Sequence, residues 1–402
     1  MRLATSQFYN SNTSSMTRLQ IESNETLQQL ATGKRINTTA DDPVASIALE
    51  NLNQQDERLS QYQNNITLAN NRLSQQESRV GEYEDLLMSL RDKILQSNDG
   101  ALDDSAREAL ALDLEEGLNS IIALGNTQDE NGNYVFAGYQ SDVKPFVTDA
   151  NGDVTYLGDE GRRSSQVAEG ISVQVSESGQ TLFMDANTGS GDYSADYANA
   201  TMNGDFFVES ADIIDPSLPA IDGIELTFGD DGSGVRTVTA TDDQGNVLLP
   251  TQPFDASQPM VIAGREIAIS GSPEDGDSVT LSHQPTTDVF SSVQSAIDLL
   301  RSPNGLEGNN AQAEFAQILT DFDGAQEAAS VVRAESGNYL SSLDTFQAQH
   351  ESMELVNATA KSSLEDLDYA AAITKFEQQS LALNAVTQSF AQIQSVSLFN
   401  YI

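Results

Sequence analysis

The chain has 402 residues, of which 61 are Asp or Glu and 19 are Lys or Arg, so its formal net charge at pH 7 is −42. This excess of acid argues against nucleic-acid binding, which needs a basic surface, and it disfavours anionic membranes. Cysteine is absent, which excludes disulfides and thiolate sites. No apolar run is long enough for a membrane span, and the N-terminus lacks the apolar core of a Sec-type signal peptide, so we expect neither.

The first thirty residues predict a weak helix followed by a break. Their apolar residues recur every three or four positions, but Ser, Thr, Asn and Gln surround them, so the helix would be marginal alone. Gly33 suits the position just beyond a helix end. The spacing follows Met16, Leu19, Ser23, Thr26 and Leu30.

A long helix is predicted to start at Asp42 and Pro43. Asp is a good N-cap, and Pro fits the first helical turn, where its missing N–H would be unpaired anyway. From Ala45 to Ile94 the 3-4 spacing of apolar residues never slips, which indicates one long helix with a single apolar seam. A helix capped by Asp103 or Asp104 is expected to pack back along it. The seam includes Leu52, Leu59, Ile66, Leu73, Val80, Leu87 and Ile94.

Between residues 126 and 287 the apolar period becomes two. Alternation at 171–175, 224–228 and 267–269 predicts short strands, and Gly- and Asp-rich stretches between them predict tight turns. We also expect a turn at Ser178 and Gly179 that leads into an extended segment at 181–183. A Gly-, Asp- and Ala-rich run at 187–204 divides this antiparallel β region, so two lobes and one lobe with a long loop both remain open.

Two helical seams follow the β region. Each keeps the 3-4 spacing, but they are out of phase by two residues, so the phase must be reset between Asn357 and Asp368. Ser363, with Asp366 three residues later, can cap a new helix there. The first seam includes Phe315, Phe322, Val332, Tyr339 and Phe346, and the second includes Tyr369, Phe376, Leu383, Val386, Phe390 and Ile393.

These elements predict an α+β fold: a long-helix bundle or coiled coil, built from the N- and C-terminal segments, with an inserted antiparallel β region. We interpret the seams of residues 45–94 and 315–346 as bundle core. We expect the two end seams to be shared between subunits. The predicted divisions are an N-terminal assembly helix at 1–40, bundle halves at 41–136 and 288–357, the β insertion at 137–287, and a C-terminal assembly helix at 358–402.

No pattern indicates catalysis, a cofactor or a metal. The two histidines, His283 and His350, lie in different predicted regions, and no glycine motif that cradles phosphate is present. The stretch 149–153 imitates the start of a calcium loop, but its glycine is at the fourth position rather than the sixth, so we expect a hairpin turn. The sequence therefore predicts a protein that is not an enzyme.

Several motifs resemble the flagellin superfamily, in order along the whole chain. They are ATGKRIN at 31–37 with DDP at 41–43, NGNYVFAGY at 131–139 with PF at 145–146, RAE at 333–335, and LEDLDYA at 364–370. Within the superfamily the pattern is most similar to hook-associated proteins of type 3, the hook–filament junction proteins. Pro43, the FAG at 136–138 and the ending SLFNYI at 397–402 favour this branch over flagellin itself.

The resemblance implies a structural adaptor of the bacterial flagellum that polymerises at the hook–filament junction; the alternative is flagellin, the filament subunit. The implied partners are further copies in a ring, the first hook-associated protein, flagellin and a cytoplasmic export chaperone. The family is exported unfolded without a cleaved signal peptide, and its end helices order on assembly. A secreted adhesin would require the motifs to be coincidental. The residues expected in self-assembly are Met16, Leu19, Leu30, Tyr369, Phe376, Leu383, Val386, Phe390, Ile393, Leu398 and Phe399.

Overall fold

The computed structural model of the chain describes residues 2–98, 102–150, 152–219, 221–303 and 306–395, with the backbone alone at 2–6, 8 and 393–395. Two compact units are present. The terminal unit combines Met1–Asn64 with Thr345–Ile402, and the central unit is Asn65–Asp344. No helix in the described part of the chain is both long and apolar enough to cross a membrane.

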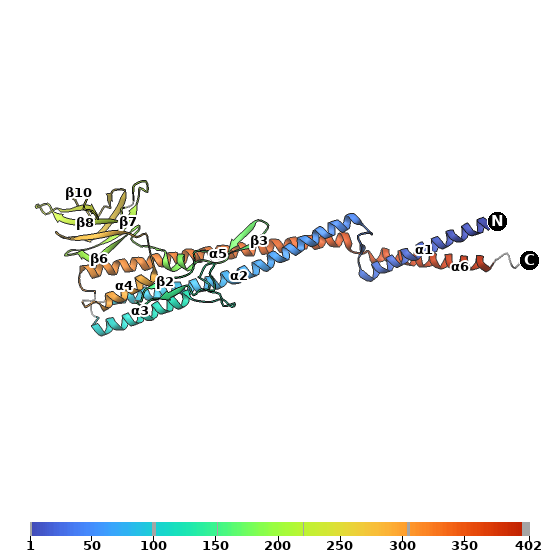
Figure 1. Cartoon of the computed structure of the whole chain (residues 1–402), viewed down its shortest axis with the longest axis horizontal. Helices are drawn as coiled ribbons and strands as arrows, with labels where there is room; N and C mark the ends of the chain where they lie inside the picture. Colours follow the sequence, from blue (N-terminus) through green and yellow to red (C-terminus); the bar gives the residue numbers. More distant parts are fainter. Residues whose placement is uncertain (1, 99–101, 151, 220, 304–305, 396–402) are drawn as a thin grey trace, which may run out of the picture. The chain divides into compact units, whose positions relative to one another are not determined.

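Long helices precede and follow an antiparallel β region, which confirms the predicted α+β fold (Figure 1). Asp42 Oδ1 accepts a hydrogen bond from the Ala45 N–H at 3.1 Å, and Asp103 accepts one from Ala106 at 2.8 Å, so both predicted caps are confirmed. The helices are α1 Arg2–Thr32, α2 Pro43–Ser97, α3 Asp104–Gly125, α4 Val289–Arg301, α5 Asn309–Glu365 and α6 Tyr369–Ser395.

The central unit has a helical core formed by α2, α3, α4 and α5. Helices α3 and α4 lie side by side (Figure 1). Gly117 lets α3 approach α2 closely, because a Cβ atom there would lie 2.2 Å from Leu90 Cδ2. Burial of each Leu, Ile or Phe side chain of this core contributes about 1.5–3 kcal/mol to the stability of the folded chain. The apolar seam of α2 from residue 65 onward therefore stabilises the central unit strongly.

An aromatic cluster joins this core to a hairpin formed by β1 (Phe146–Thr148) and β2 (Val154–Tyr156). The Phe183 ring lies 4.7 Å from Tyr83, 5.4 Å from Phe136 and 5.1 Å from Phe146, measured between ring centroids. Asn126 donates to the Phe146 carbonyl and accepts from its N–H, both at 2.9 Å. The Asp149 N–H donates to the Asp153 carbonyl at 2.9 Å between the two paired strands, as a hairpin requires and as predicted.

The segment around Phe183 is not extended, and the prediction for 181–183 was wrong. Gln180–Met184 form a single π-helical turn, η1. Neighbouring side chains of a strand point to opposite faces, but Leu182 and Phe183 are both fully buried in the helical core. A helical turn places both side chains inward, and that burial overrides the local strand pattern.

The β insertion is one domain with a shared core, accompanied by small hairpins. A five-stranded sheet in the order β10-β9-β8-β13-β6 packs with a three-stranded sheet in the order β11-β12-β7. Strand β8 alternates as expected, with Ile224, Leu226 and Phe228 buried. The strands are β1 Phe146–Thr148, β2 Val154–Tyr156, β3 Ser164–Ala168, β4 Ile171–Gln174, β5 Ala186–Asn187, β6 Tyr193–Thr201, β7 Asp205–Ile213, β8 Gly223–Asp230, β9 Arg236–Asp242, β10 Val247–Pro253, β11 Met260–Ile262, β12 Arg265–Ser272, β13 Ser278–His283 and β14 Thr286–Thr287.

The run at 187–204 is largely a strand rather than a dividing loop. It contains β6, which Tyr193 and Tyr197 anchor with their buried rings. Strand β6 pairs with β13, about eighty residues later in the chain. Local composition does not reveal such a distant partner, so the run resembled a loop in the sequence.

In the terminal unit, α1 packs along α6, and residues 43–64 of α2 pack along residues 345–365 of α5. Helix α5 continues to Glu365, past the predicted division at 357/358, because Asn357 and Lys361 both bind Asp56 of α2. Ser363 lies inside α5 and does not cap α6, contrary to the prediction. The cap is Asp368, whose Oδ1 accepts from the Ala370 and Ala371 N–H groups.

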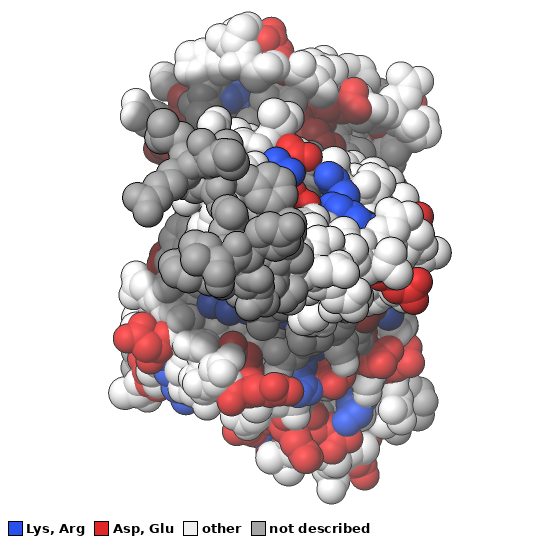
Figure 2. Space-filling model, turned by 90° about the vertical axis from the view of Figure 1, so that its right-hand side faces the viewer, with Lys and Arg blue, Asp and Glu red and all other residues white. Residues whose placement is uncertain are grey.

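Acidic side chains dominate the charged surface. On the face in Figure 2 they form broad areas, with Lys and Arg scattered between them. Basic residues bridge helices: Arg333 of α5 contacts Glu77 and Glu84 of α2, each at 2.7 Å. Hydrogen bonds to these two carboxylates raise the pKa of the Arg333 guanidinium. Arg333 of the RAE motif therefore links α5 to α2.

Candidate assembly interface

The two end helices form a pair whose facing seams are only partly covered. The rings of Tyr9 and Phe390 lie 5.2 Å apart, and Thr26 and Ala372 are buried between the helices. Of the predicted assembly residues, Tyr369 is 53% exposed. Ile393 has no described side chain, and Leu398 and Phe399 lie outside the described residues. The half-buried ones are Met16, Leu19, Leu30, Phe376, Leu383, Val386 and Phe390.

Both end helices also expose apolar side chains that lie off the predicted seams. Leu381 is 75% exposed, Ile21 54%, Leu27 51% and Ile373 48%. The 3-4 spacing missed them because it selects one stripe per helix. The signal in the sequence was a surplus of apolar residues around that stripe, which a single partner helix cannot bury. Large exposed apolar areas mark interaction sites.

The bundle-core residues are mostly buried in one chain. Leu52, Tyr339 and Phe346 are half-buried. The buried residues are Leu59, Ile66, Leu73, Val80, Leu87, Ile94, Phe315, Phe322 and Val332.

Polar groups in the α2–α5 seam of the terminal unit were missed. Asp56 accepts from Asn357 at 2.7 Å and from Lys361 at 2.5 Å, and His350 stacks on Tyr62. Burial opposes the charge on Asp56, but hydrogen bonds from Lys361 and Asn357 outweigh it and lower the pKa of this carboxyl. Continuing the 3-4 spacing beyond Phe346 would have reached His350 and Asn357. Such polar positions specify register in long helix pairs.

The motif around Gly33 forms the connection between the end helices and the longer ones. The Asp41 carboxylate accepts from the Asn37 and Thr38 N–H groups at 2.9 and 2.8 Å. These bonds lower the pKa of Asp41, and the bond from Ala45 lowers that of Asp42. Both carboxyls therefore stay charged and organise the turn that leads into α2.

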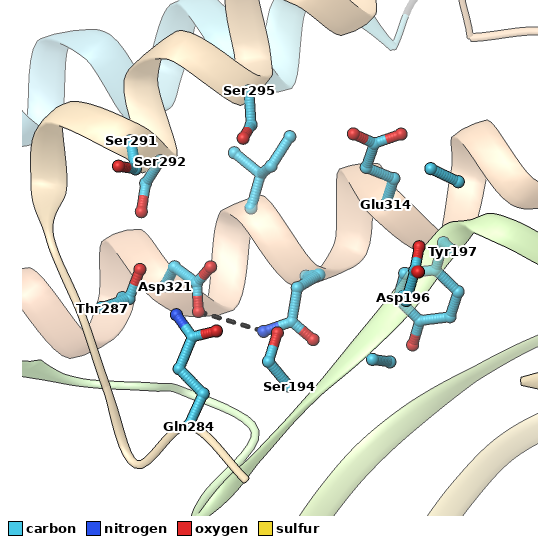
Figure 3. Close-up of a pocket in the computed structure, with 14 residues that line it drawn as sticks. Ser194, Asp196, Tyr197, Gln284, Thr287, Ser291, Ser292, Ser295, Glu314 and Asp321 are labelled. Carbon is cyan, nitrogen blue, oxygen red and sulfur yellow. Dashed lines mark hydrogen bonds between the residues drawn. The ribbon is translucent and has the colours of Figure 1, made fainter. Parts of the chain in front are cut away.

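A polar cleft of about 240 Å³ lies between β6, α4 and α5 in the central unit. Figure 3 shows Glu314 and Asp321 on α5, with Ser291, Ser292 and Ser295 on α4. Among the described residues, no Lys, Arg or His lines it. Burial, with Asp298 and Asp196 nearby, raises the pKa of Glu314. Burial also raises the pKa of Asp321 to about 6, although Gln317 and the Gly189 N–H donate to it.

Asp321→Asn is expected to stabilise the chain at pH 7.5 by about 1–2 kcal/mol. Between pH 4 and 6 the folded state holds a proton on Asp321 that the unfolded state has lost, so wild-type stability falls as the pH rises through this window. Partial exposure reduces the full effect of about 3 kcal/mol. Urea unfolding at pH 4, 5, 6 and 7.5 measures the difference, with exposed Asp243→Asn as the control. A gap that persists at pH 4, or a variant less stable at pH 7.5, would contradict the assignment.

Known proteins resemble this chain in sequence. Residues 3–141 match the profile of the bacterial flagellin N-terminal helical region. The chain is 26% identical to flagellar hook-associated protein 3 of Salmonella typhimurium, with 99% of each chain covered. The predicted resemblance to the flagellin superfamily is therefore confirmed. The Escherichia coli protein of the same name is 25% identical to this chain, again over 99% of both chains.

A solved structure agrees with this branch of the flagellin superfamily. The flagellar junction protein FlgL from Legionella pneumophila matches with a TM-score of 0.67 and 25% identity, covering 79% of this chain and all of that one. The predicted similarity to hook-associated proteins of type 3, rather than to flagellin, is therefore confirmed.

Proposed function

We propose that this chain is the structural adaptor that polymerises at the hook–filament junction and connects the hook to the filament. The proposal rests mainly on the pair formed by α1 and α6. Within a single chain, the apolar faces of these two helices remain half-covered. Full-length similarity to flagellar hook-associated protein 3 supports the same conclusion.

The free energy of ordering α1 and α6 becomes more favourable when neighbouring copies cover their apolar faces. Helix α1 has 31 residues and α6 has 27, and fixing each backbone residue costs about 1–2 kcal/mol. Half-buried seams return little of that cost within one chain. Further burial of half-buried Leu, Phe and Val side chains between copies offsets part of that cost. Assembly therefore favours the ordered end helices.

The distribution of charge along the chain also supports the end helices as the contact surface between copies. Residues 1–32 hold two basic and two acidic residues, and residues 369–402 hold one of each. The whole net charge of −42 thus falls between residues 33 and 368. Copies packed through their end helices avoid like-charge repulsion, whereas the acidic remainder keeps the free chain soluble.

The proposed division follows the predicted segments, except that the second bundle half extends to Glu365. Residues 1–40 and 366–402 make the assembly contacts, 41–136 and 288–365 form the bundle, and 137–287 form the β insertion. We infer a ring of copies, seated on the first hook-associated protein, with flagellin added beyond it. A cytoplasmic chaperone holds the C-terminal helix before export, which needs no cleaved signal peptide. The chain acts outside the cell through contacts between side chains rather than through catalysis.

An assembly experiment seeded with flagellar fragments distinguishes an adaptor from a filament subunit such as flagellin. Purified chain added to flagellar fragments should bind their ends without forming long tubes, because an adaptor completes a ring and then stops. Electron microscopy of the fragments measures the added length, with purified flagellin as the control that elongates. Tubes of this chain that keep growing would favour the filament-subunit alternative.

A further inference from the structure

Two interruptions of the helices, far apart in sequence, bind each other in the terminal unit. Lys34 and Asp366 form an antiparallel bridge. The Arg35 N–H donates to the Glu365 carbonyl at 2.6 Å, and the Leu367 N–H donates to the Gly33 carbonyl at 3.0 Å. We call Gly33–Arg35 together with Leu364–Tyr369 the clasp. It joins the end of α1 to the start of α6.

Side chains reinforce the clasp from both strands. Lys34 Nζ lies 2.9 Å from Glu365 Oε2, and Arg35 Nη2 donates to the Leu364 carbonyl at 2.6 Å. The ion pair is partly exposed, so it contributes little by itself. Most of the clasp's specificity therefore comes from the paired backbone.

Gly33 shows how closely the two halves fit. Its φ of +72° belongs to the left-handed region, and a Cβ atom there would lie 2.7 Å from the Tyr369 hydroxyl oxygen. A residue at the end of α1 is thus matched to the first residue of α6. Local hydrogen bonds hold the end of α1 and the start of α6, and the paired backbone of the clasp adds the contacts that link the two.

We propose that the clasp couples the two end helices, so that α1 and α6 gain and lose order together. When the clasp closes, the last turn of α1 and the first turn of α6 are held at once, and each helix then grows from an existing turn rather than from a costly nucleus. A copy that has ordered one end helix thereby positions the other. The coupling is a property of the single chain and does not depend on where the chain assembles.

The double variant Lys34→Cys, Asp366→Cys tests the coupling by allowing a disulfide across the clasp. The chain has no native cysteine that could form a competing disulfide. These residues form a non-hydrogen-bonded antiparallel pair, a type with Cα atoms about 4.5 Å apart, which suits a disulfide. By hydrogen exchange with mass spectrometry on the full chain, the oxidised form should exchange at least about tenfold more slowly than the reduced form in both α1 and α6. Slowing in only one helix, or in neither, would overturn the proposal.

Gly33→Ala provides a second test from the N-terminal side. It should speed exchange in α6 as well as in α1, and Tyr369→Phe in the same chain should restore part of the protection by removing the crowded oxygen. Gly132→Ala is the matched control: its φ is +83° and nothing lies within 4 Å of its Cβ position, so the end helices should not respond. An effect of Gly33→Ala confined to α1 would show that the two helices are independent.

Discussion

Replacing Leu383, Val386 and Phe390 together by Asp is expected to abolish incorporation of the chain into flagella. All three side chains are half-buried on the face of α6 that contacts α1. Full burial of an exposed apolar side chain contributes about 1.5–3 kcal/mol, and these three are already half-buried, so the triple change removes roughly 2–4 kcal/mol of burial between copies. It also places three carboxylates in an apolar contact, which costs more. Microscopy of a complemented deletion strain measures incorporation.

The monomer should keep most of its far-UV helical signal, because α2 and α5, with 55 and 57 residues, do not depend on α6 for their core. The matched control replaces three exposed residues of the same helix by Asp and so adds the same charge. These residues are Gln378, Asn384 and Gln388. Loss of the monomer's overall fold would instead place the seam in its own core. Equal failure of the control would show that charge, and not the apolar seam, decides assembly.

The long helices could be predicted from the sequence because their determinants are local. The seam of α2 repeats without a slip, and Asp42, Pro43 and Asp103 carry helix-start chemistry that needs no distant partner. The alternation of β8 likewise follows from one buried face. In each case the period of the apolar residues reports directly on which face packs.

The remaining features depend on contacts between distant parts of the chain. The pairing of β6 with β13 and the burial of Leu182 beside Phe183 come from tertiary packing, which overrides local pattern. The end of α5 could not be placed because Asn357 and Lys361 continue the helix by binding Asp56, about three hundred residues away. The Gly33 and LEDLDYA motifs were visible as sequence, but the clasp between them was not.

The end helices show the same contrast. Their seams could be read from spacing, and the structure places Tyr9 against Phe390, as a helix pair requires. Exposed Leu381 and Ile373 lie off those seams and became apparent only once the packing of α6 was known. Spacing identifies the first partner of a helix; a surplus of apolar surface indicates that further partners exist.

Deletion of the gene is the most direct test that this chain joins the hook to the filament. Electron microscopy of the cells and an immunoblot of the medium for flagellin are the measurements, and a strain complemented with the wild-type gene is the control. We expect hooks without filaments and flagellin monomers in the medium, because flagellin would still be exported but would find no surface on which to polymerise. Normal filaments on the deleted strain would contradict the assignment.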